Sequence, residues 1–169
     1  MLSQIAVDVR FYSPPEDLRR YFTTFYYTNI TLPHGATVND ALQPEWANLR
    51  VFSGGTPTAW VEGGPVLKGS SMVVTGPTSR AINFEIPATR MWGIGLLPMG
   101  WARFMPRAAV ICANSLTCGQ THPDCEPFRP LADTIFQGEP SEEAELALRI
   151  SRNLRGELAG RVQQAHVRG

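Results

Sequence analysis

Residues 90–105 read RMWGIGLLPMGWARFM, and this stretch decides the fold. Its first half is apolar and is interrupted only by Gly93 and Gly95, a pattern that predicts a buried strand over residues 91–97. Because alternate side chains of a strand share a face, the glycines lie together on one face. The opposite face carries three large apolar side chains, which are Trp92, Ile94 and Leu96. Glycines on one face let a backbone or a ligand come close, or let the sheet bend.

The second half of the stretch changes from strand to helix. Pro98 ends the strand, and Trp101, Phe104 and Met105 follow at helical spacing. Before this point the sequence has the character of strands, and after it the character is mostly helical. We therefore expect a β domain followed by a helical layer, and we expect residues 90–105 to couple the two.

Composition bounds the class of protein. A chain of 169 residues with 43% hydrophobic and 18% charged residues fits one globular domain with a substantial core. Fifteen positive and fifteen negative side chains give a formal net charge of zero, which is not the electrostatic pattern of a nucleic-acid-binding domain. The sequence shows no signal-peptide pattern and no apolar run near the roughly 20 residues of a membrane span. We expect a soluble cytoplasmic protein with reduced thiols.

Short strands dominate the first half of the chain. A short helix is predicted over residues 15–21, and residues 36–45 are predicted as a loop with at most one helical turn. The absence of a βαβ rhythm argues against a parallel sheet. Short strands separated by Gly/Pro turns are typical of a sandwich or a small barrel. The predicted strands before the opening stretch are residues 5–11, 22–32, 46–53, 58–62, 66–67, 71–75 and 80–86.

The second half of the chain is predicted to be mostly helical. A loop over residues 117–130 separates two early helices from two later ones. The last helix is long and amphipathic, because leucine or isoleucine recurs every four residues along it. Its apolar stripe is Leu146, Ile150, Leu154 and Leu158. The four predicted helices are residues 100–105, 106–116, 131–137 and 142–162.

Catalytic and metal-binding patterns are weak in this sequence. A metal site in a barrel needs several histidines and a carboxylate on the strands, whereas His34, His122 and His166 lie in a turn, a loop and the tail. Cys118, His122 and Cys125, with Cys112, have metal-like spacing but lack the paired-cysteine motif of structural zinc sites. Thiols that fill small gaps are the favoured interpretation. No phosphate loop, nucleophile elbow or dinucleotide fingerprint is present, so no enzyme class and no cofactor is expected.

Aromatic residues are the remaining signal. They are Tyr26, Trp46, Phe52, Trp60, Phe84, Trp92 and Trp101. Aromatic side chains of this kind can form an ordinary core, and they can also line a pocket for an apolar or planar ligand with Arg50, Glu62 or Asn83 as polar anchors. Both interpretations stay open on these residues alone.

The order of segments resembles a known family. A helix–strand unit over residues 14–32 is followed by the segments LRVF (49–52), VTGPT (74–78) and WGIGLLPMGWARF (92–104). Together they resemble the N-terminal sensor domain of AraC-type bacterial transcription regulators. The resemblance implies a mostly β fold with C-terminal helices, in which an antiparallel cupin-like, jelly-roll β-barrel precedes a helical layer. It assigns residues 1–138 to the barrel and residues 139–169 to a dimerisation or linker helix and its tail.

The resemblance also implies a function. A small-molecule effector would bind inside the barrel, with Trp92 facing the interior, and the predicted ligand-binding residues are Trp46, Arg50, Phe52, Trp60, Met72, Phe84 and Trp92. A homodimer would form through the stripe Leu146, Ile150, Leu154 and Leu158, although the same stripe could pack on its own barrel.

The family's helix-turn-helix region is missing from this sequence. The chain is therefore expected to be part of a regulator or a stand-alone sensor, and not to bind DNA by itself. Two alternatives stay open. One is a cupin-like metal-dependent enzyme, and the other is a structural dimerisation module with no ligand.

Overall fold

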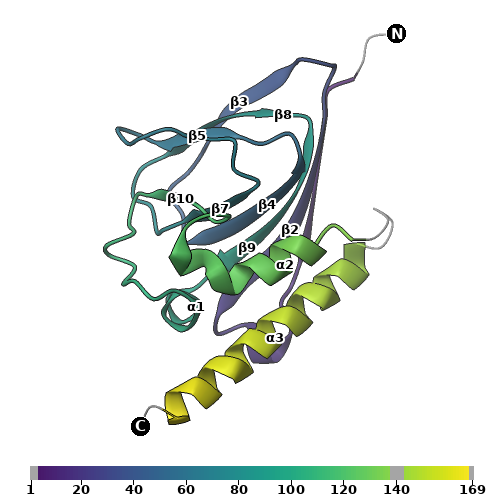
Figure 1. Ribbon diagram of the computed structural model, residues 1–169. Coiled ribbons are helices and arrows are strands. Elements are labelled where there is room, and N and C mark those ends of the chain that lie inside the picture. The colour runs from purple at the N-terminus through teal and green to yellow at the C-terminus, as the bar shows by residue number, and fades with distance from the viewer. Residues whose placement is uncertain (1–3, 138–142, 168–169) are drawn as a thin grey trace.

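The structure is a computed structural model that describes residues 4–137 and 143–167. Two antiparallel sheets face each other, and helices cover the outer face of the larger sheet (Figure 1). The six strands of the larger sheet are, in spatial order, β1 (Ala6–Tyr12), β2 (Phe22–Thr31), β9 (Thr89–Leu96), β4 (Asn48–Gly54), β7 (Met72–Thr75) and β10 (Leu116–Cys118). The four strands of the smaller sheet are β3 (Thr37–Leu42), β8 (Ile82–Pro87), β5 (Thr58–Val61) and β6 (Leu67–Lys68).

The helices come mainly from the second half of the chain. A 3-10 turn, η1 (Glu16–Leu18), precedes β2, and a second 3-10 segment, η2 (Pro123–Phe128), precedes α2. The α-helices are α1 (Pro98–Phe104), α2 (Arg129–Thr134) and α3 (Glu143–Val167). The predicted α+β class, mostly antiparallel β with C-terminal helices, is confirmed. The predicted barrel is not confirmed, because neither sheet closes on itself among the described strands.

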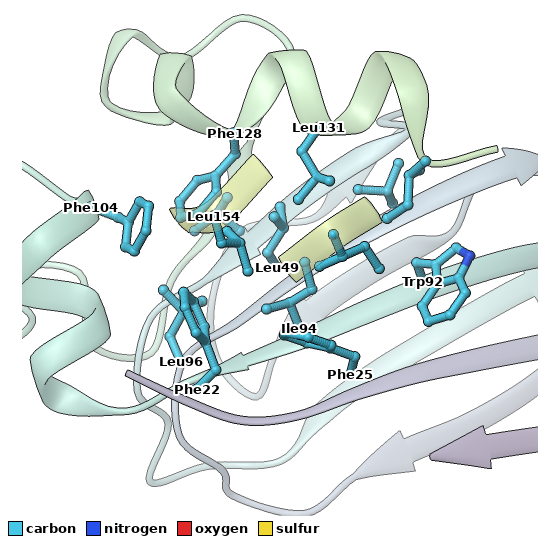
Figure 2. Close-up of a cluster of buried hydrophobic side chains, with 14 of the residues drawn as sticks. Phe22, Phe25, Leu49, Trp92, Ile94, Leu96, Phe104, Phe128, Leu131 and Leu154 are labelled. Atoms are coloured by element: carbon cyan, nitrogen blue, oxygen red, sulfur yellow. The ribbon is translucent and has the colours of Figure 1, made fainter. Parts of the chain in front are cut away.

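Strand β9 lies inside the larger sheet, between β2 and β4, as the apolar run of residues 91–97 predicts. Its Trp92, Ile94 and Leu96 are buried on the face that meets the helices. Figure 2 shows these side chains in one cluster with Phe128 and Leu131. The strand is thus covered on one side by helices, while its glycine face looks toward the smaller sheet.

Helix α3 packs on the chain's own core. Leu146, Ile150 and Leu154 are buried in the same hydrophobic cluster as the larger sheet, and Leu158 packs against that cluster. In this chain the stripe packs on the chain's own core, which is the alternative to a dimer interface that the sequence left open. The physical reason is that the helix covers a sheet face whose apolar side chains would otherwise meet water.

Three predictions of secondary structure are wrong. The loop expected over residues 117–130 contains most of β10 and the whole of η2. Residues 37–42 form the edge strand β3, which pairs with β8, where a loop was expected. This strand is short, and Asp40 interrupts the apolar face that Val38 and Leu42 share, so its period-two pattern is a weak signal. Residues 106–115 form bends and turns and not a helix, and Leu116 begins β10. Val110 and Ile111 are exposed there, and Asn114 has a positive φ of 55°, which a continuous helix does not allow.

Among the residues that the structure describes, no helix has both the length and the apolar character needed to cross a membrane.

Candidate functional site

A cavity of about 640 Å³ lies between the two sheets. Most of its walls are aliphatic or aromatic side chains, contributed by both sheets. The smaller sheet supplies Val38, Leu42, Ala59, Ile82, Phe84 and Ile86, and the larger sheet supplies Val7, Val9, Phe11, Ile30, Phe52, Val73, Met91 and Leu116. The volume is within the range of small-molecule sites, which are mostly apolar with a few well-placed polar groups.

On the cavity side of the larger sheet, Tyr26 of β2 lies across the glycine face of β9 and lines the cavity. Tyr26 is the direct partner of Gly93 in the register between β2 and β9. A Cβ atom on Gly93 would lie 1.9 Å from Cζ of the Tyr26 ring, so only glycine leaves room for the ring. Gly95 plays the same part for Thr23, whose Oγ1 would lie 2.0 Å from an added Cβ. The close approach that the sequence predicts is therefore made by the protein's own side chains.

A polar cluster that includes Tyr26 lines the same side of the cavity. The Tyr26 hydroxyl lies 3.1 Å from Oδ1 of Asn48 on β4, and donates to it. Two residues along β4, Arg50 donates to Oε1 of Glu45 at 2.6 Å and to Oγ1 of Thr75 at 3.3 Å. All five of these residues line the cavity. A ligand between the sheets would therefore meet polar groups at one place and apolar walls elsewhere.

The charges in this cluster support one another. Burial acts to lower the pKa of Arg50, whereas the neighbouring Tyr26 and Glu45 act to raise it. The raising effects are larger together, so the pKa of Arg50 lies above its ordinary value. Burial raises the pKa of Tyr26, and although the Arg50 guanidinium opposes this, Glu45 acts in the same direction as burial. At neutral pH the guanidinium is therefore charged and the phenol protonated, which lets Tyr26 act as a hydrogen-bond donor.

The contact between Gly93 and Tyr26 can be tested by Gly93→Ala. We expect this change to lower the free energy of unfolding by about 1–3 kcal/mol, because the methyl group must displace the ring and its hydrogen bond to Asn48. Glycine-to-alanine changes in strands are otherwise favourable, so the sign of the effect is informative. Urea unfolding measures it. In a Tyr26→Ala background the same change should cost less than about 1 kcal/mol, and an equal loss in both backgrounds would contradict the assigned contact.

The structure brings together four of the seven predicted ligand-binding residues. Arg50, Phe52, Phe84 and Trp46 all line the cavity, Trp46 at its rim with 56% of its surface exposed. Arg50 and Phe52 lie on one face of β4, as the alternation of residues 46–53 predicts.

Trp60, Met72 and Trp92 do not line the cavity, which corrects their expected placement. Trp92 and Met72 are buried on the helix side of the larger sheet. Trp60 lies on the outer face of the smaller sheet, because its neighbour Ala59 points inward on β5. In each case side chains alternate between the two faces of the strand as expected, but the predicted residue lies on the face that points away from the cavity.

Several cavity residues were missed by the sequence reasoning. Asn48 lies on the same face of β4 as Arg50, so period-two alternation could have included it. Tyr26 was among the aromatic residues that could line a pocket, but its contact with Gly93 follows only from the pairing of β2 with β9. Glu45 lies in a connection between strands, and no local pattern marks it.

The loop of cysteines and His122 is separate from the cavity. The described residues include no group of three or more His, Cys, Asp or Glu side chains placed to hold a metal ion. Nδ1 of His122 instead accepts a hydrogen bond from the backbone N–H of Asp124 at 3.2 Å, as a helix cap. Burial raises the pKa of Cys125 to about 11. Burial also acts to raise that of Cys118, but hydrogen bonds from Ser70 and Thr121 lower it below the usual value.

Comparison with protein-family models, with curated proteins and with solved structures finds no match to this chain.

Proposed function

We propose that this chain is the effector-sensing domain of a bacterial transcription regulator of the AraC type, and that its effector is a small, largely apolar molecule held between the two sheets. The observation that carries the proposal is the cavity, which has apolar walls and one polar cluster. The two facing sheets would then correspond to an open form of the family's cupin-like barrel. A regulator of this class acts in the cytoplasm and reaches DNA through a helix-turn-helix domain outside this sequence.

The polar cluster favours an effector with an uncharged hydrogen-bonding end. Arg50 is already paired with Glu45 at 2.6 Å, so a ligand carboxylate would have to separate the two. Separating a largely buried ion pair is costly, whereas an uncharged hydroxyl or carbonyl group can join the hydrogen bonds of Tyr26 and Asn48. The long apolar walls then hold the rest of the molecule.

The position of β4 between the cavity and the helices supports the transmission of a structural change from the effector to the helices. On β4, Arg50 faces the cavity while Leu49 and Val51 on either side of it are buried in the core on the helix side. A ligand that shifts this strand therefore changes the packing of α2 and α3. An effector that binds one arrangement better shifts the population toward it, and the helices would pass that change to the DNA-binding domain.

Two other functions are less well supported by the same residues. A cupin-like metalloenzyme would need ligating histidines around the cavity, and none of the residues that line it is histidine or cysteine. A purely structural module would have a filled interior, in contrast to the open volume between these sheets.

Titration with N-phenyl-1-naphthylamine, an uncharged fluorescent apolar probe, tests the proposed site. We expect saturable binding, and a loss of affinity of about tenfold or more in Ala59→Phe, because the new ring fills space on the cavity wall. The matched control is Thr58→Phe, which places the same ring on the opposite face of β5 and should leave the affinity unchanged. Circular dichroism checks that both variants fold. Probe binding that survives in folded Ala59→Phe would place the site elsewhere.

A further inference from the structure

Strand β1 leaves one edge of the larger sheet uncovered. It pairs with β2 on one side, and no other strand of the described chain lies on its other side. An apolar row on this segment is strongly exposed, with Ile5 at 65%, Val7 at 55%, Val9 at 42% and Phe11 at 71%, although Val7, Val9 and Phe11 also line the cavity between the sheets. An exposed, apolar edge strand is a ready template for pairing with another strand, and proteins usually protect such edges.

The sequence of this edge is complementary to itself in one antiparallel register. When two copies pair with Val9 opposite Val9, Val7 of each copy lies opposite Phe11 of the other. On the other face of the strand, Asp8 of each copy then lies opposite Arg10 of the other. Aromatic–β-branched pairs and opposite charges are the favourable cross-strand combinations. A slip of the register by one residue would instead place apolar and charged side chains against each other.

We propose that β1 is the interface between two copies of this chain, paired antiparallel about Val9. A two-fold axis at Val9 joins the two six-stranded sheets into one continuous sheet, as an isologous interface requires. A second copy is the occupant because the edge matches itself in both apolar pattern and charge. The stripe of α3 is not available for this purpose, since it is buried in the chain's own core.

The charged residues on this edge can exchange partners at small cost. Asp8 and Arg10 of one copy form an ion pair of 3.2 Å on the exposed surface, with side chains 55% and 58% exposed. Such an exposed pair contributes little to stability. In the dimer each residue meets its opposite charge on the second copy, so no charge is left without compensation.

Cysteine crosslinking tests the register directly. In a background of Cys112→Ser and Cys118→Ser, Val9→Cys should form a disulfide-linked dimer on mild oxidation, because residues directly opposite each other are within disulfide reach. Val7→Cys and Phe11→Cys are the matched controls. Each alone should form no disulfide-linked dimer, since its own counterpart lies roughly 13 Å away along the strands, and a mixture of the two should crosslink. Equal crosslinking of all three single variants, or none by Val9→Cys, would overturn the proposal.

A charge reversal tests the same interface without a covalent bond. Asp8→Arg and Arg10→Asp each place like charges opposite each other in a homodimer, so each should weaken self-association by about tenfold or more. An equimolar mixture restores opposite charges and should form the heterodimer, measured by sedimentation velocity. Circular dichroism establishes that these exposed substitutions leave the fold intact. Unchanged self-association of both single variants, or a mixture that stays monomeric, would contradict pairing through β1.

Discussion

Trp92→Ala is expected to lower the free energy of unfolding by about 3–5 kcal/mol, the range for removal of a large aromatic side chain from a core. Trp92 is fully buried, with 0% of its surface exposed. Its ring lies between Tyr12 and Tyr27, with centroid distances of 5.6 and 5.4 Å. Its Nε1 has no hydrogen-bond partner among the described residues, so the loss is one of packing. Urea or thermal unfolding followed by circular dichroism measures the change.

Trp60→Ala is the matched control for this prediction. Trp60 is half-buried on the outer face of the smaller sheet, where its removal opens no internal cavity. We expect a loss of no more than about 1 kcal/mol, as for a partly exposed position. The comparison tests the face of each strand, because the sequence alone treats the two tryptophans alike. Similar losses in the two variants would contradict the assigned faces.

The second large effect is expected for Glu45→Ala. This change leaves Arg50, whose side chain is only 10% exposed, without the carboxylate that lies 2.6 Å away. The guanidinium cannot relieve this cost by losing its proton, because arginine stays protonated at neutral pH even where it is buried. Breaking a fully buried pair costs about 3–5 kcal/mol, and because Glu45 is 25% exposed we expect roughly 2–3 kcal/mol here.

A double-mutant cycle separates the ion pair from its surroundings. The cycle consists of Glu45→Leu, Arg50→Met and the double variant. The double variant removes both charges and keeps apolar volume, so it should be more stable than Glu45→Leu alone. Unfolding in urea at neutral pH measures all members of the cycle. A double variant that is less stable than Glu45→Leu would show that the two residues do not act as a pair. Binding of the apolar probe to the double variant then reports how much of the affinity depends on the polar cluster.

Much of the fold could be predicted from local patterns. The strand at residues 91–97, the long strand at 22–32 and the helix at 142–162 all have strong periodicity, and each is present with small differences in its ends. The helix predicted over residues 106–116 is wrong. Pro106 resembles a helix start, but the apolar side chains that follow it have no core to pack on. The chain forms turns there instead of a helix, and the following strand, β10, pairs with β7.

The candidate site could be predicted only in part. Arg50 and Phe52 followed from alternation along one strand. The contact of Tyr26 with Gly93 joins residues far apart in the sequence, and strand pairing alone brings them together. Glu45 reaches Arg50 from a connection whose path no periodic pattern determines.

The sequence by itself determined which side chains of β9 share a face, because alternation in a strand is fixed by backbone geometry. It placed Trp92, Ile94 and Leu96 together, and Gly93 and Gly95 opposite them. Only the tertiary structure decided which face meets the helices and which meets the cavity. The larger sheet is covered on both sides, so apolar residues suit either face, and hydrophobicity cannot distinguish them. Side-chain volume makes the distinction. Trp92 fills the core cluster that the sheet shares with the helices, and the glycines leave room on the opposite face for Tyr26 to lie across it.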